Sequence, residues 1–444
     1  MEQRKKRTRL NAFQMIIFGF LCVILLGSLL LMLPISTKDR QGAGFLDALF
    51  TATSATCVTG LIVRDTASYW STFGQCVILL LIQVGGMGVV TIAVSFAMVA
   101  GRKISLFQRS TMQEAISAPQ VGGILRMTGF ILRISLSIEL LGAVLLSYPF
   151  CREFGAARGL YYAIFHSISA FCNAGFDLMG IKEPFSSLTS FAAQPLVNFT
   201  IMALIIVGGI GFLTWDDVRT HKLRLRRYRM QTKVALTVSA VLILVPALGY
   251  FFFEFHTQPL GTRLLYSLFQ AVTPRTAGFN TANLSAMREA GIAVMILLML
   301  IGGSPGSTAG GMKTTTVGVL FAACASIFRR QDSAHLFRRR VDDATVKHAA
   351  AILLLYLSLF LSCGLVISLL EGLPLLTCLF ETASAVGTVG LTLGITPQLG
   401  LISHLLLIAL MFLGRVGGLT LIYAALSSRP AGLSKYPVER ITVG

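Results

Sequence analysis

Long apolar stretches alternate with short polar ones along this chain. Runs of about 20 apolar residues, the length that a helix needs to cross a bilayer, occur at 13–33, 76–100, 196–212, 235–253, 349–370 and 404–426. A further run starts at Ile292 and is interrupted by glycines after Ile301. The first run ends at Pro34; it is too long for a removable signal peptide and lacks a small-residue cleavage site. The pattern predicts an all-α integral membrane protein.

Four shorter segments lie between the long runs, and each leads into a stretch that ends in glycine. The segments cover 45–55, 160–170, 264–273 and 375–385, and the stretches are 56–60, 171–175, 274–278 and 386–390. Ten to fifteen residues are too few to cross a bilayer, so we expect re-entrant half-helices. Alignment on the glycines places Phe50, Phe165, Leu268 and Phe380 at one position, and Ser54, Ser169 and Ser384 at another.

This recurrence predicts four units of helix, half-helix and helix, with eight transmembrane helices in total. All four units begin and end on the same side, so we expect parallel repeats around a central pore. Residues 1–100 would form the first repeat, 101–218 the second, 219–328 the third with an intramembrane gate loop, and 329–444 the fourth with the C-terminal tail.

The glycine-ended stretches suit a cation pathway. Each half-helix would point its C-terminal end, which carries partial negative charge, at the pore axis. Backbone carbonyls from four segments can replace the water around an ion, which offsets a burial cost on the order of tens of kcal/mol. Ordinary turn or packing glycines are the alternative, but four matches in the same context favour a pore.

Glycines recur in the spans that follow these stretches, at 85–88, 208–211, 302–306 and 414–418. For the first two clusters we favour close helix packing. Residues 301–313 differ, because they place five glycines and a proline inside an apolar run. Such a sequence predicts a broken helix and a polar loop at membrane depth, a candidate gate. The same loop only approaches a phosphate-binding motif, since Met312 separates glycine from lysine and no strand precedes it.

The net charge of +18 is unevenly distributed. Segments that we place in the cytoplasm (the N-terminus, 102–133, 216–233, 329–347 and the tail) carry 26 of the 37 basic residues but only 8 of the 19 acidic ones. This asymmetry predicts cytoplasmic termini and argues against a nucleic-acid partner. The basic runs 219–233 and 329–347 are expected to meet anionic membrane lipid or a regulatory partner. The eight cysteines are dispersed without metal-ligand spacing, and no catalytic constellation is present, so we expect no enzyme.

A few charged residues fall in apolar surroundings. Arg415 lies inside the last apolar run, where we expect a hinge contact with the loop at 301–313, a barrier in the pathway being the alternative and snorkelling the ordinary explanation. Glu381 would either hold a filter by hydrogen bonds or meet solvent. Glu139 is expected against another helix, Arg275 beside a filter, and Asp47 at the positive end of a half-helix.

These residues together resemble the Trk/Ktr/HKT superfamily of potassium transporters, and within it the Ktr-type bacterial membrane subunit. The resemblance covers nearly the whole chain and rests on the four glycine-ended stretches and on residues 275–280, 302–314, 414–418 and 436–444. It implies a homodimer with one pore per subunit, in which the tail 436–444 lies at the dimer interface. It also implies a cytoplasmic ring of nucleotide-binding regulatory subunits, so that nucleotide acts only through this partner and no covalent cofactor is needed.

The resemblance also assigns roles to individual residues. It implies that potassium is bound at a selectivity filter made of Val58, Thr59, Gly60, Asn173, Ala174, Gly175, Thr276, Ala277, Gly278, Thr388, Val389 and Gly390. It implies a gate made of Gly302, Gly303, Ser304, Pro305, Gly306, Ser307, Thr308, Ala309, Gly310 and Gly311, with Lys313 and Arg415 beside them.

The sequence therefore predicts potassium uptake across the plasma membrane through a channel-like subunit. Glycine rather than serine at position 60 resembles the potassium-selecting pattern. Sodium transport, or coupled sodium and potassium transport on the same scaffold, is the alternative.

Overall fold

The computed structural model describes residues 11–99, 104–116, 122–222, 224–418 and 420. The basic N-terminal run, the last six residues of the apolar run 404–426 and the tail 436–444 lie outside the described residues. Within them, four helices are long and apolar enough to cross a membrane. They are α1 (Ala12–Leu31), α6 (Ile124–Phe154), α10 (Met230–Gly249) with the π-helical turn Tyr250–Glu254, and α14 (Asp343–Glu371).

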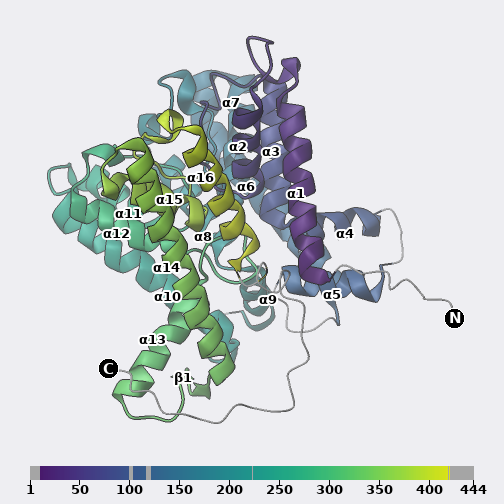
Figure 1. Cartoon of the computed structure of the whole chain (residues 1–444), viewed down its shortest axis with the longest axis vertical. Helices are drawn as coiled ribbons and strands as arrows, with labels where there is room; N and C mark the ends of the chain where they lie inside the picture. The colour runs from purple at the N-terminus through teal and green to yellow at the C-terminus, as the bar shows by residue number, and fades with distance from the viewer. Residues whose placement is uncertain (1–10, 100–103, 117–121, 223, 419, 421–444) are drawn as a thin grey trace.

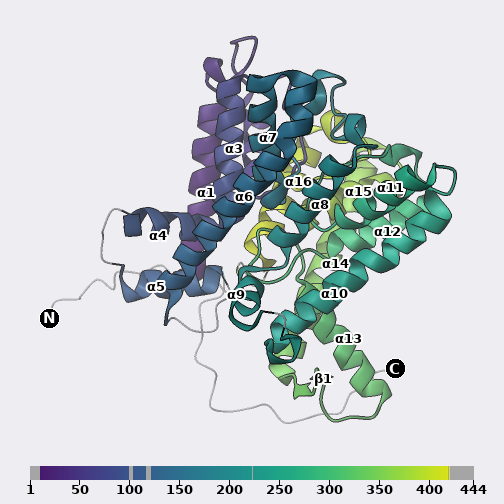
Figure 2. The ribbon, with the colours of Figure 1, turned by 180° about the vertical axis from the view of Figure 1, so that it is seen from behind.

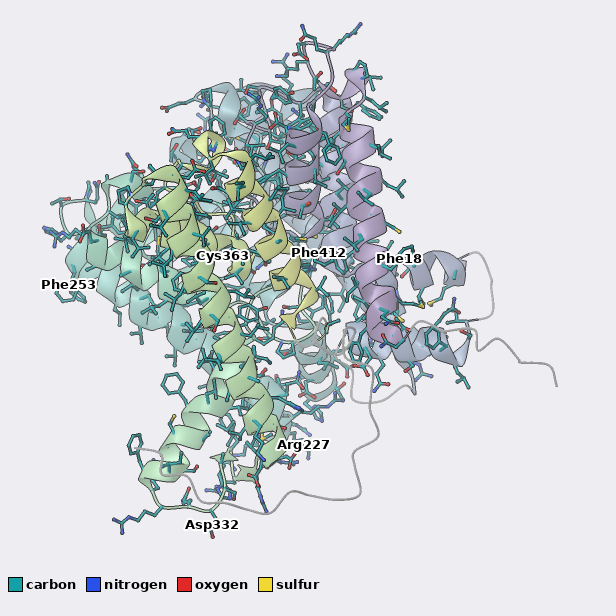
Figure 3. All side chains as sticks on the ribbon, viewed as in Figure 1. Phe18, Arg227, Phe253, Asp332, Cys363 and Phe412 are labelled. Atoms are coloured by element: carbon teal, nitrogen blue, oxygen red, sulfur yellow. The ribbon has the colours of Figure 1, made fainter. Side chains whose placement is uncertain are left out.

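The long helices carry apolar side chains on the outer surface of the molecule. Phe18 on α1 and Phe253 after α10 are both more than half exposed, and Figure 3 shows them at the periphery. Exposed leucines follow the outer faces of α6 and α14, among them Leu136, Leu140, Leu354 and Leu369. Arg227 and Asp332 lie at the lower end of the same view. An apolar belt with charged residues at one end is the surface of a protein that crosses a membrane several times.

Two predicted spans are sharply bent. The run 76–100 is not one continuous span as expected, because α3 (Thr72–Met87) and α4 (Val89–Val99) meet at 95°. Likewise α8 (Pro195–Gly209) and α9 (Phe212–His221) meet at 94°. The breaks fall at Gly88 and Gly211, whose φ angles of 86° and 94° suit only glycine. Similarly, α16 (Leu401–Val416) ends before Gly417, whose φ angle is 90°, so the run 404–426 is also broken at a glycine.

A shorter helix lies at each of the four positions predicted for half-helices. These are α2 (Phe45–Thr56), α7 (Ala156–Phe171), α11 (Leu260–Val272) and α15 (Leu375–Gly387). An irregular segment follows each of them. In Figure 1, α2, α15 and α16 lie in the upper half of the molecule, and Figure 2 shows α7, α8 and α11 from behind. All four short helices end within the protein interior, because the residues that follow them, Val58, Asn173, Thr276 and Thr388, are buried.

The third quarter contains the expected interruption. Helix α12 (Glu289–Leu300) ends, residues 301–313 run without helix, and α13 (Thr314–Phe328) follows. Beyond α13, β1 (His335–Leu336) and β2 (Arg339–Arg340) pair antiparallel, a small hairpin that the all-α expectation missed. Figure 1 places α13 and β1 at the lower end, away from the short helices. Helix α5 (Leu106–Ala115), which begins with a capping box at Ser105, follows α4.

Glycines allow three returning helices to approach the ends of the short helices. A methyl group on Gly85, Gly208 or Gly414 would overlap with the carbonyl oxygen of Thr56, Phe171 or Val386 respectively. Each of these oxygens belongs to the residue four places before a filter glycine. The packing role expected for the first two clusters is therefore what the structure shows, and the fourth cluster shares it.

We predict that Gly85→Ala lowers the apparent unfolding temperature and the yield of monodisperse protein in detergent. The added methyl would press on backbone, which cannot rotate away, and overpacking of this kind costs about 1–3 kcal/mol. Thermal unfolding followed by fluorescence and size-exclusion chromatography measures both quantities. Gly249→Ala is the matched control, because no atom lies within 4 Å of its added methyl. Equal stability of the two variants would contradict the packing argument.

Candidate functional site

The four glycines of the predicted filter close a ring. A methyl group on Gly60 would strike the carbonyl oxygen of Ala174, and one on Gly175 would strike that of Ala277. From Gly278 the contact is with Val389, and from Gly390 it returns to Thr59. In every case the methyl would lie 2.7 Å or less from the oxygen. Segments more than a hundred residues apart are thus brought together in chain order around one point.

The same backbone conformation recurs in all four segments. Val58, Asn173, Thr276 and Thr388 have φ angles between 52° and 65°, and the glycine two residues later also has positive φ in each case. Left-handed conformations cost an ordinary residue about 1–2 kcal/mol. Four such residues in equivalent places show that tertiary contacts, and not local preference, determine this backbone.

Hydroxyl groups near the end of each short helix fasten the segments. The amide of Gly60 donates to Ser54 Oγ at 3.1 Å, and the amide of Gly390 donates to Ser384 Oγ at 3.0 Å. In the other two quarters the hydroxyl donates instead, from Ser169 to the carbonyl of Phe176 and from Thr273 to that of Phe279. All four hydroxyl side chains are buried.

The third segment corrects our alignment by one residue. Thr59, Ala174 and Val389 donate their amides to carbonyls five residues earlier, whereas Ala277 donates to Thr273, four residues earlier. This segment is therefore one residue shorter between helix and glycine. Consequently Phe269, which is fully buried, and not the partly buried Leu268, corresponds to Phe50, Phe165 and Phe380.

Electrostatics at the ring favour a cation. Helices α2, α7, α11 and α15 end immediately before the four segments, so their partially negative C-terminal ends all adjoin the ring. The three other charged residues that we singled out nearby are held by protein contacts. Gln83 of α3 donates to Glu139 at 3.1 Å, Arg275 donates to Ser239 of α10 at 2.8 Å, and Asp47 pairs with Arg64 at 2.8 Å.

The loop at residues 302–311 lies directly against the ring. A methyl group on Gly310 would overlap with the side chain of Thr388, and one on Gly311 would lie 2.9 Å from the carbonyl oxygen of Gly387. Thr308 donates its hydroxyl to the carbonyl of Phe171 at 3.1 Å. The loop thus touches the second and fourth filter segments at once.

Neighbouring helices hold the rest of the loop. The amide of Ser304 donates to the carbonyl of Gly209 at 2.8 Å, and the amide of Phe212 donates to that of Gly306 at 2.6 Å. Ser304 Oγ and Thr314 Oγ1 are hydrogen-bonded at 2.9 Å. A methyl on Gly306 would lie 2.6 Å from the carbonyl oxygen of Ile116, just beyond α5. Motion of the loop would therefore disturb these contacts with the second quarter of the chain and, at the ring, the contacts with the fourth.

Arg415 joins this loop to the first quarter. One guanidinium nitrogen donates to the carbonyl of Thr308, and the other donates to the carbonyls of Gly85 and Gly86. Lys313 folds back on the loop and donates to the carbonyls of Ala309 and Gly310 at 2.9 and 3.2 Å. In the part of the chain that the structure describes, both cations meet backbone carbonyl dipoles and neither forms an ion pair with an acid.

A cavity of about 310 Å³ lies beside the loop. Its lining includes the charged side chains of Glu114, Lys313 and Arg415, together with apolar groups such as Met87 and Phe212. Gly306 and Gly311 of the loop also line this space, together with Gly414 of α16. In the part of the chain that the structure describes, no group of three or more His, Cys, Asp or Glu side chains is placed to hold a metal ion.

Sequence reasoning missed part of this site. Thr273 escaped because the shorter third segment shifts it by one position. Thr308 was expected in the gate loop, but a hydroxyl in a glycine-rich loop carries no signature of its partner, the carbonyl of Phe171. Glu381 was left open between two roles; it is fully buried and accepts hydrogen bonds from Thr392 and Thr396, so solvent contact is excluded.

Comparisons with known proteins agree with this geometry. The family model described as "TrkH: Cation transport protein" matches residues 2–435. The chain is 39% identical to the potassium/sodium uptake protein NtpJ of Enterococcus hirae, over 100% of this chain and 99% of that protein. It is also 39% identical to the Ktr system potassium uptake protein B of Bacillus subtilis, over 99% and 98% of the two chains.

A solved structure shares the fold. The potassium transporter TrkH from Vibrio parahaemolyticus superposes with a TM-score of 0.74 and covers 96% of this chain and 87% of its own, at 19% sequence identity. At that identity the likeness establishes the architecture alone.

Proposed function

Because this chain belongs to the TrkH family of cation transport proteins, a family of transporters and not of enzymes, we propose that it is the membrane subunit of a Ktr-type potassium uptake system. The observation that carries the proposal is the closed ring of Gly60, Gly175, Gly278 and Gly390. The potassium uptake named for its relatives from Enterococcus hirae and Bacillus subtilis supports the choice of ion.

In this proposal the chain forms four parallel repeats with the boundaries 1–100, 101–218, 219–328 and 329–444, and eight spans if each bent or broken pair counts as one. The lower end in Figure 1, where the basic segments around Arg227 and 329–347 lie, faces the cytoplasm, and the apolar belt faces lipid of the cell membrane. Both termini are then cytoplasmic.

Selectivity arises at the filter residues. The carbonyl groups of Val58 and Thr59, and of the matching pairs in the other three segments, replace the hydration shell of potassium. The pairs are Asn173 and Ala174, Thr276 and Ala277, and Thr388 and Val389. Four converging helix ends lower the electrostatic cost of dehydration. Because the glycines carry no side chain, the four backbone segments come close enough together to surround one ion.

Residues 302–311 act as the gate, with Lys313 and Arg415 holding the closed position. The loop contacts two filter segments from the side of the charged cavity, so it lies where it blocks the way out of the ring. Polar backbone at this depth is tolerated because it lines a pathway. Opening requires Arg415 to release Thr308 or to move with it.

We further propose a homodimer that sits on a cytoplasmic ring of nucleotide-binding regulatory subunits. Nucleotide then acts only through that partner, and the transported potassium ion is the sole ligand of this chain apart from lipid. The α13 helix and the β1–β2 hairpin, which project at the cytoplasmic end, offer a surface that such a ring reaches. Sodium-coupled transport is the second candidate, favoured by the potassium/sodium uptake named for the Enterococcus hirae relative.

Ion flux into proteoliposomes tests the proposed function. Rubidium serves as the potassium substitute, and its uptake is measured with potassium present alone and with sodium present alone. We expect the purified protein, with its regulatory subunit, to take up rubidium under both conditions. Uptake that needs sodium, or uptake of radioactive sodium at a similar rate, would favour the second candidate. Flux of neither ion would overturn both. A potassium-uptake-deficient bacterium grown at low external potassium provides an independent measurement.

Gly60→Ser is expected to reduce the preference for potassium over sodium by about tenfold. Serine at a φ of 94° is strained, and its Cβ would displace the carbonyl of Ala174 from the ring. The ratio of rubidium to sodium flux measures the change. Gly44→Ser is the matched control, because an added Cβ at Gly44 meets no atom within 4 Å. An unchanged ratio in Gly60→Ser would remove the first segment from the filter.

Arg415→Ala is expected to raise flux severalfold in the absence of the regulatory subunit, because the loop loses its link to Gly85 and Gly86. Arg415→Lys should behave similarly but less strongly, since an ammonium group cannot span both sets of carbonyls. Flux with and without the partner is the measurement. The exposed Arg158→Ala controls for lost charge. If flux and its regulation stay at the wild-type level in Arg415→Ala, Arg415 does not hold the gate.

A further inference from the structure

Each short helix carries a further buried polar side chain at one equivalent position behind the filter. Three residues before the fastening hydroxyls of Ser54, Ser169, Thr273 and Ser384 stand Thr51, His166, Gln270 and Glu381, which we term the polar quartet. All four are at most 1% exposed. Burial of polar groups inside a membrane protein is costly unless they are hydrogen-bonded. Their recurrence at one structural position therefore calls for a role.

Glu381 fastens the chain that leaves the fourth filter segment. Its Oε1 accepts hydrogen bonds from the hydroxyl of Thr392 and from the amide of Leu393 at 3.3 Å, while Oε2 accepts from the hydroxyl of Thr396 at 2.9 Å. These three donors lie two to six residues beyond Gly390. In the part of the chain that the structure describes, no Lys or Arg forms an ion pair with Glu381.

His166 does the same for the second segment. Its Nε2 accepts a hydrogen bond from the amide of Leu178 at 3.3 Å, and Nδ1 lies 2.7 Å from the carbonyl oxygen of Tyr162. A nitrogen that accepts from an amide carries no proton, so Nδ1 bears the hydrogen and donates it to Tyr162. The ring is therefore neutral and held in one tautomer by its two partners.

The two fastenings are equivalent in place. Leu178 lies three residues beyond Gly175, and Leu393 lies three residues beyond Gly390. The ring contacts run in order from the first segment to the fourth. The second and fourth segments are therefore not neighbours, and they face each other across the ring. Thr51 and Gln270, in the other two quarters, make no side-chain hydrogen bond to any residue that the structure describes.

We propose that His166 and Glu381 are positioning residues that fix two facing filter segments and thereby set the discrimination between potassium and sodium, while Thr51 and Gln270 only fill the equivalent space. The inference rests on the proposed function. Selectivity by carbonyl oxygens depends on their number and their spacing. A segment that a side chain of its own short helix holds three residues beyond the glycine resists collapse around a smaller ion, whereas a segment without that hydrogen bond yields more easily.

The experiment compares the rubidium-to-sodium flux ratio of variants in all four quarters. Glu381→Leu and His166→Leu remove the acceptors and should lower the ratio about fivefold to tenfold each. Glu381→Gln should retain most of the wild-type ratio, since its Oε1 still accepts from Thr392 and Leu393 and its amide can donate to the hydroxyl of Thr396. His166→Gln should retain part of it through a carbonyl that accepts from Leu178.

Thr51→Val and Gln270→Leu are the matched controls, because they remove polar groups that make no hydrogen bond, and should leave the ratio unchanged. A purely structural role would lower protein yield and both fluxes together without moving the ratio. Should Glu381→Leu fail to fold, the double variant Thr392→Val with Thr396→Val removes the two hydroxyl donors to Glu381 and leaves the amide of Leu393, and should shift the ratio in the same direction by a smaller amount.

Two results in these variants would overturn the proposal. One is an unchanged ratio in the Leu variants, or in the double variant if Glu381→Leu does not fold. Another is an equal shift in the Thr51 and Gln270 controls. If the ratio moves in Gly60→Ser but not in these variants, the filter stands and only the positioning role fails. If the wild-type protein carries neither ion, the proposed function fails and this inference falls with it.

Discussion

The structure depends on the mutual approach of four backbone segments to a distance that excludes even one methyl group. Gly60, Gly175, Gly278 and Gly390 each face the carbonyl oxygen of a neighbouring segment, and each has a φ angle that disfavours any other residue. Everything around the ring serves this approach. The short helices deliver the segments, and glycines in three returning helices let those helices come close behind them.

A second constraint follows from the first, because backbone brought into the interior must satisfy its hydrogen bonds. Hydroxyls at the ends of the short helices accept from or donate to the filter backbone. On one side, Arg415, Lys313 and Thr308 donate hydrogen bonds to carbonyl groups of the loop and its neighbours. On the other side, His166 and Glu381 accept hydrogen bonds from backbone amides beyond the glycines. The loop and the four glycine-ended segments are thus parts of one hydrogen-bonded assembly.

The sequence predicted most of the helical segments and the four glycine-ended stretches, since apolar length and glycine placement are local properties. It was less reliable wherever a partner distant along the chain decides the outcome. The alignment placed Leu268 where Phe269 is buried, because nothing local reveals that the third segment is one residue shorter. The run 76–100 was predicted to be one span, because a single glycine in the sequence does not reveal a 95° bend. Glu381 and Thr308 carried no sign of the groups they contact.

By itself, then, the sequence determined that the chain crosses a membrane, that four short helices lead into glycine-ended segments, and that residues 301–313 cannot continue a helix. These follow from hydrophobicity over about 20 residues and from the backbone freedom of glycine and rigidity of proline. Only the tertiary structure decided that the four glycines meet in a closed ring, that Arg415 links the loop to the first quarter, and that buried polar groups fasten two facing segments. The ring and the Arg415 contacts join residues a hundred or more positions apart, and the geometry of all these contacts is determined by packing that no local pattern records.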